Sequence, residues 1–196
     1  MTRGKRLKIA SYNINGINSR FAVLARWLSE FRPDVACLQE LKCTDEAFPA
    51  DSLSDLGYES IWHGQRSWNG VAILSRIGAP VETRRALPDD PNLDQSRYLE
   101  AAVSGILIGN LYAPNGNPKP GPKFDYKLTW LDRLSDHGQH LIDNEDLRLQ
   151  VSGHRKGQSQ IHSARIMFHR RVNELFHLSK CHNLIELLRD FCPFHS

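Results

Sequence analysis

Cysteines, long apolar runs and net charge are all scarce in this sequence. Its 196 residues include four cysteines, and their spacing shows no disulfide framework, which is typical of a reducing compartment. No run approaches the roughly 20 apolar residues of a membrane span. The short apolar run at residues 7–10, behind a basic N-terminus, is too brief for a signal-peptide core. We therefore expect a cytoplasmic protein that does not bind membranes.

The small net charge of +3 is unevenly distributed along the chain. Residues 1–149 contain 18 Lys and Arg against 19 Asp and Glu, whereas residues 150–196 contain 7 against 3. Six of the nine histidines also lie in the second segment. Such a basic segment could contact nucleic acid, although an excess of four charges does not by itself identify a partner.

Apolar periodicity over the first part of the chain predicts an α/β fold. The run at residues 7–10 is followed by a helical pattern over 21–31 and by a second buried run at 35–38, a strand–helix–strand opening. Further strands are predicted at 58–62 and 70–74. A hairpin is predicted at 99–103 and 106–111, and a helix from about residue 127 to 143, after a proline-rich loop over 113–124.

The composition changes at Gln150. Residues 151–163 are polar and rich in Gly, Ser, Gln and His, which is typical of a linker. Apolar spacing over 164–191 predicts one or two amphipathic helices and no strand. We therefore divide the chain into residues 1–149 and a basic, His-rich tail of residues 150–196 made of a linker and helices.

The tail also contains two close pairs of side chains that can bind zinc. They are His177 with Cys181, and Cys192 with His195. Zinc ligands often come in such pairs. Both pairs would have to converge across a helical segment, so a zinc site is the less favoured interpretation.

Two polar residues, Asn13 and Glu40, follow the first two predicted strands. In open α/β sheets, binding sites form at the carboxyl ends of strands. An amide and a carboxylate that meet there could hold a divalent metal ion and a phosphate. Taken alone, each residue has a simpler interpretation: a turn residue for Asn13 and a solvated strand end for Glu40.

Five motifs in series point to a known family. In order they are SYNINGI at 11–17, PDV at 33–35 with LQELK at 38–42, WHGQ at 62–65, NGVAILS at 69–75 and NLYAPNG at 110–116. Up to Leu149 the chain resembles the exodeoxyribonuclease III family of apurinic/apyrimidinic (AP) endonucleases, within the endonuclease/exonuclease/phosphatase superfamily. The resemblance covers about three quarters of this chain and a little over half of a complete family member.

The resemblance implies a fold, a reaction and three site residues. The fold is a partial four-layer α/β sandwich, with two mixed sheets between helices, here followed by the helical tail. The reaction is hydrolysis of DNA phosphodiesters with Mg²⁺, or alternatively Mn²⁺, by a monomer acting on double-stranded DNA with abasic sites or 3′ ends. By motif position, Glu40 binds the metal, Asn13 lies beside the metal and the scissile phosphate, and Tyr112 is the active-site tyrosine.

Three further residues are candidates for substrate binding: Asn115 in the NLYAPNG motif, Lys119 in the loop that follows, and Arg97 in the segment QSR. For Lys119 a phosphate contact competes with the favoured interpretation of a solvated surface loop. For Arg97 a DNA phosphate contact and a surface ion pair are equally favoured.

The chain departs from the family after Leu149. The family continues there with Gly-Asp-x-Asn, whose aspartate is the usual candidate for activating water, and ends with Ser-Asp-His. Here residues 150–154 read QVSGH, and neither motif nor the later metal-binding aspartate stands in its place. The Ser-Asp-His triplet at 135–137 is no substitute, because it lies inside a predicted helix. We therefore predict a truncated, catalytically impaired half-site without an evident general base.

Two alternative functions stay open. The chain could be a non-catalytic remnant that binds nucleic acid without cleaving it, or a phosphoesterase of the same superfamily acting on another substrate. The HGQ segment at 63–65 and the Asn-Gly pair at 115–116 favour DNA repair over the second alternative.

Overall fold

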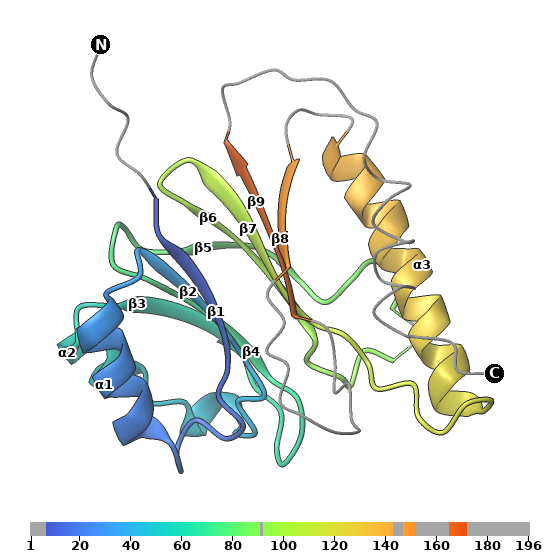
Figure 1. The fold of residues 1–196 in the computed structure, drawn as a ribbon, viewed down its shortest axis with the longest axis horizontal. Coiled ribbons are helices and arrows are strands. Elements are labelled where there is room, and N and C mark those ends of the chain that lie inside the picture. The colour runs from blue at the N-terminus through green and yellow to red at the C-terminus, as the bar shows by residue number, and fades with distance from the viewer. Residues whose placement is uncertain (1–6, 91, 143–146, 152–164, 172–196) are drawn as a thin grey trace.

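The computed structural model describes residues 7–90, 92–142, 147–151 and 165–171. These residues form two β-sheets that pack face to face, with helices α1 and α2 outside one sheet and helix α3 outside the other (Figure 1). The four layers agree with the predicted sandwich. In the described part of the chain, none of the helices has both the length and the apolarity of a membrane span.

The first sheet has the strand order β1-β2-β4-β3. Its strands are β1 (Ile9–Asn13), β2 (Val35–Gln39), β3 (Glu59–His63) and β4 (Val71–Ser75). β1 and β2 are parallel, with Asn13 opposite Gln39, whereas the other pairs are antiparallel. The parallel pair needs a crossover, and helix α1 (Phe21–Phe31) supplies it over the span predicted from periodicity. The helix ends at Phe31 and is capped by Arg32, which has a φ of 43° and precedes Pro33.

The second sheet is antiparallel, with the order β5-β6-β7-β9-β8. Its strands are β5 (Val81–Arg85), β6 (Tyr98–Val103), β7 (Ile106–Tyr112), β8 (Leu147–Val151) and β9 (Arg165–Arg171). The predicted hairpin is confirmed: β6 and β7 join at Ser104 and Gly105, both with positive φ. Strand β5, which is exposed along its length, was not predicted.

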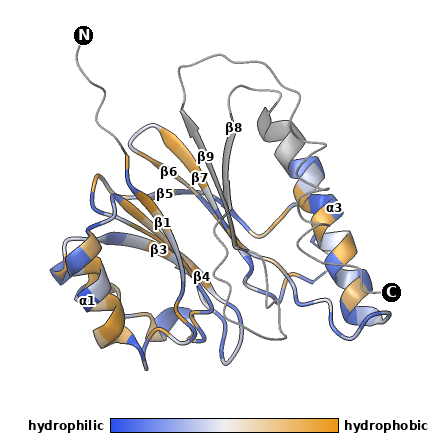
Figure 2. Ribbon diagram, in the orientation of Figure 1, coloured by the Kyte–Doolittle hydropathy of each residue, from blue (hydrophilic) through white to orange (hydrophobic). Residues whose placement is uncertain are grey.

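Three apolar clusters hold the layers together, and hydrophobic residues follow the strands in Figure 2. One lies between the sheets and includes Val35, Ile73, Leu99 and Ile108. A second packs α1 and α2 (Ala50–Asp55), next to the 3₁₀ turn Asp45–Ala47, on the first sheet. A third packs α3 (Pro122–Ile142) on the second sheet around the fully buried Trp130. Each pair of adjacent layers is therefore joined by burial of apolar surface, the main favourable term in folding.

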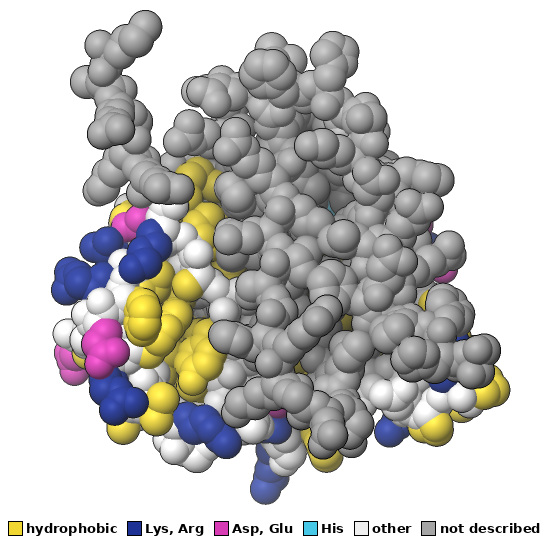
Figure 3. Space-filling view, in the orientation of Figure 1, with side chains coloured by type: hydrophobic (Ala, Val, Ile, Leu, Met, Phe, Trp, Pro, Cys, Tyr) yellow, Lys and Arg dark blue, Asp and Glu magenta, His cyan; other side chains and the backbone are white. Residues whose placement is uncertain are grey.

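An aromatic row lies along α1 beside β1, which is an edge strand of the first sheet. The rings of Tyr12 and Trp27 are 5.2 Å apart and those of Trp27 and Phe31 are 6.1 Å apart, measured between centroids. Figure 3 shows hydrophobic side chains among Lys and Arg on this side of the molecule. The row ends at Phe31, which is half exposed and has the Lys8 ammonium 5.8 Å from its ring centre.

The structure corrects the prediction of helix over the start of the tail. Residues 165–171 form strand β9, which pairs along the whole length of β7. The helical spacing was a local pattern, whereas the open edge of β7 offers a row of backbone donors and acceptors that a strand can satisfy. Strand β8 spans both sides of the predicted boundary between residues 149 and 150. The four proposed zinc ligands lie outside the described residues.

Helix α3 begins earlier than predicted, at Pro122 rather than near residue 127. Proline is well suited to the first helical position, because its missing N–H is not needed there and its φ is already helical. The predicted proline-rich loop over 113–124 therefore included the first residues of the helix, starting at Pro122.

Candidate active site

Three strand ends from both sheets meet at one edge of the sandwich. Asn13 is the last residue of β1, Glu40 follows the last residue of β2, and Tyr112 is the last residue of β7. The first two are neighbours because β1 and β2 run parallel. Tyr112 reaches them from the facing sheet. The structure thus brings together the three residues predicted as metal and catalytic positions.

The Glu40 carboxylate accepts hydrogen bonds on both of its oxygens. Asn13 Nδ2 donates to Oε1 at 2.6 Å, and the Tyr112 hydroxyl donates to the same oxygen at 2.7 Å. Lys42 Nζ lies 3.0 Å from Oε2. Burial alone would raise the pKa of Glu40, but these hydrogen bonds and the Lys42 charge outweigh it, so the pKa lies below its ordinary value. Glu40 is therefore an ionised carboxylate at neutral pH.

The backbone around Glu40 is held in a left-handed conformation. Glu40 has a φ of 58° and Lys42 a φ of 52°. The amides of Leu41 and Lys42 donate to the carbonyls of Gly70 and Asn69 at 3.2 and 3.1 Å. A Cβ on Gly70, whose φ is 86°, would lie 2.8 Å from Leu41 Cβ. This close approach explains why an Asn-Gly pair begins the 69–75 motif.

A buried amide pair joins the two sheets directly beneath the site. Gln39 Nε2 donates to Asn110 Oδ1 at 2.8 Å, and both side chains are fully buried. Asn110 Nδ2 in turn donates to the carbonyls of Leu38 and Ala72, each at 2.8 Å. Sequence reasoning missed this pair as a functional element. Its signal was a polar residue inside each of two apolar strands, both within family motifs.

Lys42 and Asn15 are two further members of the site that were not predicted. Lys42 Nζ donates to Asn15 Oδ1 at 2.6 Å as well as contacting Glu40. The Asn15 amide N–H donates to Asn13 Oδ1 at 3.1 Å. Both residues belong to the motifs quoted for the resemblance, which is the signal that could have found them.

Arg97 lies against Tyr112. Its guanidinium carbon is 5.2 Å from the centre of the Tyr112 ring, and Nη1 donates to the Tyr112 carbonyl at 3.2 Å. Nε donates to Gln95 Oε1 at 2.5 Å. Burial lowers the pKa of Arg97, which nevertheless remains a cation at neutral pH. The described contacts make Arg97 a support for Tyr112, and its contact with DNA stays a prediction.

Asn115 and Lys119 lie in the loop between β7 and α3. Asn115 is exposed, and its Oδ1 accepts a hydrogen bond from the Asn117 amide at 3.2 Å. Lys119 Nζ lies 5.2 Å from the centre of the Phe124 ring. Neither side chain is a hydrogen-bond partner of Glu40 in the described part of the chain, so their proposed roles in substrate binding stay predictions.

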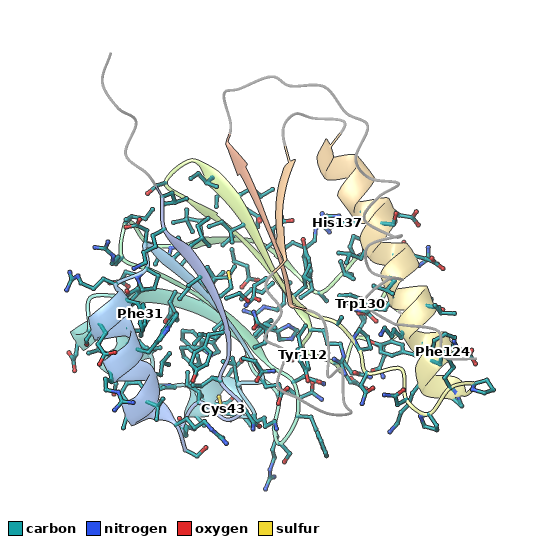
Figure 4. The ribbon with its side chains drawn as sticks, in the orientation of Figure 1. Phe31, Cys43, Tyr112, Phe124, Trp130 and His137 are labelled. Atoms are coloured by element: carbon teal, nitrogen blue, oxygen red, sulfur yellow. The ribbon has the colours of Figure 1, made fainter. Side chains whose placement is uncertain are left out.

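The Ser-Asp-His triplet at 135–137 lies on α3, where its histidine contacts the second sheet and not Glu40. His137 Nε2 lies 3.3 Å from Glu100 Oε2 and 3.2 Å from the Tyr98 hydroxyl, which donates to the same carboxylate oxygen at 2.8 Å. Thr83 Oγ1 donates to the other oxygen, Oε1, at 2.7 Å. Figure 4 shows His137 apart from Tyr112. His137 thus ties helix α3 to the second sheet.

The donor set at Glu40 suits a hard divalent cation. Among the described residues, no three His, Cys, Asp or Glu side chains lie together as a metal cluster. Glu40 is accompanied by the amide oxygens of Asn13 and Asn15. Mg²⁺ is commonly held by one or two carboxylates while it keeps several waters, so one carboxylate with nearby oxygen donors meets this minimum.

Comparison with known proteins identifies the family of the chain. Residues 10–147 match the model of the Endonuclease/Exonuclease/phosphatase family. Exodeoxyribonuclease III of Haemophilus influenzae is 38% identical over 117 residues, which are 58% of this chain and 43% of that protein.

Two solved structures of DNA-processing enzymes are similar to this chain. An AP endonuclease from Archaeoglobus fulgidus has a TM-score of 0.69 at 35% identity, and a 3′-5′ exonuclease from Neisseria meningitidis has 0.69 at 34%. Each alignment covers 74% of this chain and 56% of the other. The chain spans about half the length of the relatives it matches. With its five motifs, its two-sheet fold and these matches, the chain belongs to the endonuclease/exonuclease/phosphatase family, beside exodeoxyribonuclease III and the AP endonucleases.

Proposed function

We propose that this chain provides the metal- and phosphate-binding residues of a DNA phosphodiesterase of the exodeoxyribonuclease III type. The observation that carries the proposal is the ionised Glu40 carboxylate, held at the meeting edge of both sheets by Asn13 and Tyr112. The family is generally dependent on a divalent metal ion. We assign Glu40 as its ligand, with Mg²⁺ the expected ion and Mn²⁺ the alternative.

Each residue of the site has a chemical role in this proposal. A bound divalent ion would polarise a phosphoryl oxygen and counter the charge of the phosphate. Glu40 would hold the ion, and Asn13 keeps the carboxylate in place through its amide. The Tyr112 hydroxyl has one proton, which it donates to Glu40 in this structure. It would donate to a phosphate oxygen, as oxyanion-binding groups do, by turning from Glu40 to the substrate. Arg97 keeps the Tyr112 ring oriented by lying against it.

The proposed substrate is double-stranded DNA with abasic sites or 3′ ends. Support comes from the relatives, which include an AP endonuclease, a 3′-5′ exonuclease and a Neisseria 3′ phosphatase solved with a product DNA hairpin. A monomeric state and a cytoplasmic location remain predictions from the sequence.

A second candidate is a remnant that binds nucleic acid and cleaves it poorly. One observation favours it: in the described residues, the contacts of Glu40 include no second carboxylate and no histidine. These partners therefore include neither of the commonest general bases, histidine and carboxylate, and a general base is typically worth 10²- to 10⁴-fold in rate. In this second proposal, the chain keeps its affinity for DNA while its rate of cleavage is reduced.

The test is cleavage and binding of a duplex with one abasic site, by the purified chain with and without Mg²⁺. The matched variant is Glu40→Gln, which keeps the size of the side chain and removes its charge. Mg²⁺-dependent cleavage lost in Glu40→Gln would support the nuclease and contradict the impairment. Mg²⁺-dependent binding without cleavage would support the remnant. Hydrolysis of a small phosphodiester, without cleavage or binding of the DNA duplex, would favour a different substrate.

A further inference from the structure

Lys42 contacts the Glu40 oxygen that a divalent metal ion would be expected to bind, Oε2. Asn13 and Tyr112 both donate to Oε1 of Glu40, so Oε2 is the oxygen that carries neither of these hydrogen bonds. Lys42 Nζ lies 3.0 Å from this oxygen and donates a hydrogen bond to Asn15 Oδ1 at 2.6 Å. An ammonium group held by a carboxylate and an amide oxygen has the donor surroundings of a hard cation.

We propose that Lys42 is an internal counter-cation that neutralises Glu40 in the metal-free protein and that a divalent metal ion must displace. This inference rests on the proposed role of Glu40 as metal ligand. It assigns to Lys42 a regulatory effect on that site: the apparent metal affinity is set by competition with a side chain two residues away.

The geometry makes the displacement a movement of the side chain alone. The Lys42 backbone is fixed by the hydrogen bond that its N–H donates to the Asn69 carbonyl at 3.1 Å, whereas 30% of its side chain is exposed. The ammonium can therefore leave Glu40 for water or for a substrate phosphate without a change in the loop. Once released, it remains beside the site as a positive charge.

The partly buried ion pair of Arg76 and Asp34 is the comparison for a structural pair in this chain. Arg76 Nη2 contacts Asp34 Oδ1 at 2.8 Å, and Nε donates to the Pro33 carbonyl at 3.1 Å. The Asp34 side chain is 7% exposed, compared with 15% for Glu40. Arg76 is thus tied to backbone, whereas Lys42 contacts two side chains of the proposed site.

The competition predicts a measurable change in metal affinity. The apparent dissociation constant rises as the fraction of protein with a free Glu40 falls. Together with loss of like-charge repulsion, removal of the Lys42 charge should tighten Mg²⁺ or Mn²⁺ binding by roughly three- to tenfold. Lys42→Arg keeps the charge and should bind metal within about twofold of the native protein.

The experiment is titration of the full chain with Mn²⁺, followed by electron paramagnetic resonance, at constant ionic strength. It compares the native protein, Lys42→Met and Lys42→Arg with Lys123→Met, which removes the same charge from an exposed position on α3. Methionine is chosen because it is unbranched and is no more strained than lysine at a φ of 52°. The expected result is tighter binding in Lys42→Met alone.

A second measurement uses the native protein only, so it does not depend on whether a variant folds. Amine acetylation, mapped by mass spectrometry, should modify Lys42 at least twofold faster when Mg²⁺ is added, with Lys123 unchanged. Equal Mn²⁺ affinities of native protein and Lys42→Met, or Lys42 acetylation that ignores Mg²⁺, would overturn this inference alone. Absence of metal binding in every protein would overturn it together with the proposed role of Glu40.

Discussion

Gln39 of β2 and Asn110 of β7 are hydrogen-bonded to each other between the two sheets, Nε2 to Oδ1 at 2.8 Å. Each is followed closely by a residue of the site: Glu40 is next after Gln39, and Tyr112 is two residues after Asn110. The pair therefore sets the position of the Glu40 carboxylate relative to the Tyr112 hydroxyl. A buried polar pair of this kind is costly when it loses one member, because the other is left unsatisfied.

Replacing Asn110 alone should destabilise the protein. Asn110→Leu removes three hydrogen bonds and leaves the Gln39 amide and two carbonyls short of a partner. We expect a loss of about 2–3 kcal/mol in the free energy of unfolding, measured by urea denaturation. The double variant with Gln39→Leu should lose less than the sum of the two single variants. Simple additivity would show that the two side chains act independently.

Removing the Tyr112 hydroxyl should raise the pKa of Glu40. Tyr112→Phe deletes a donor to the charged carboxylate but keeps the ring against Arg97. The measurement is ¹³C NMR titration of the Glu40 carboxyl in the absence of metal. Tyr126→Phe is the matched control, because the Tyr126 hydroxyl contacts Asp90 at 3.4 Å instead. A pKa of Glu40 that is identical in both variants would contradict the described hydrogen bond.

The Glu100 carboxylate should contribute stability that is lost in acid. Burial raises its pKa, but hydrogen bonds from His137, Thr83 and Tyr98 outweigh this, so the folded pKa lies below the ordinary value of 4.5. A carboxyl that binds its proton more weakly when folded stabilises the protein above its unfolded pKa, and that contribution disappears as the pH falls through the folded pKa.

The variant that checks this is Glu100→Gln. It should be less stable than the native protein at pH 7 and should lose less stability between about pH 5 and pH 3. Glu59 is an exposed residue of β3, so the stability of Glu59→Gln should change with pH as that of the native protein does. Thermal unfolding followed by circular dichroism across this range gives the comparison. Parallel acid profiles for Glu100→Gln and the native protein would count against the role of Glu100.

Trp68 should contribute to DNA binding. Its side chain is 70% exposed, and it precedes Asn69, whose carbonyl accepts the Lys42 amide beside Glu40. An exposed indole near the proposed DNA-binding site can stack on a base, and such contacts are typically worth about 1–3 kcal/mol. Trp68→Ala should therefore weaken binding of a labelled abasic duplex by about fivefold or more, measured by fluorescence anisotropy. Phe31→Ala, which removes another exposed ring at the opposite end of the β1–α1 unit, should have no effect.

Local sequence patterns were enough to place most elements that position the site. The helical face over 21–31 became α1 with the same bounds, and the apolar runs became β2, β3, β4 and the β6–β7 hairpin. These patterns succeed because a buried face repeats with the period of its own element. They failed at residues 165–171, where the available edge of β7 selected a strand over a helix.

The sequence by itself therefore determined the family, the order of the elements and the candidates Asn13, Glu40 and Tyr112, because motifs and periodicity are properties of neighbouring residues. Only the tertiary structure decided which side chains meet. It joined Gln39 to Asn110, placed Arg97 behind Tyr112 and brought Lys42 to Glu40 and Asn15. The physical reason is that these contacts form only when strands pair and sheets pack. Gln39 and Asn110 are 71 residues apart on different sheets, whereas Lys42 and Asn15 are 27 residues apart beyond two paired strands of one sheet.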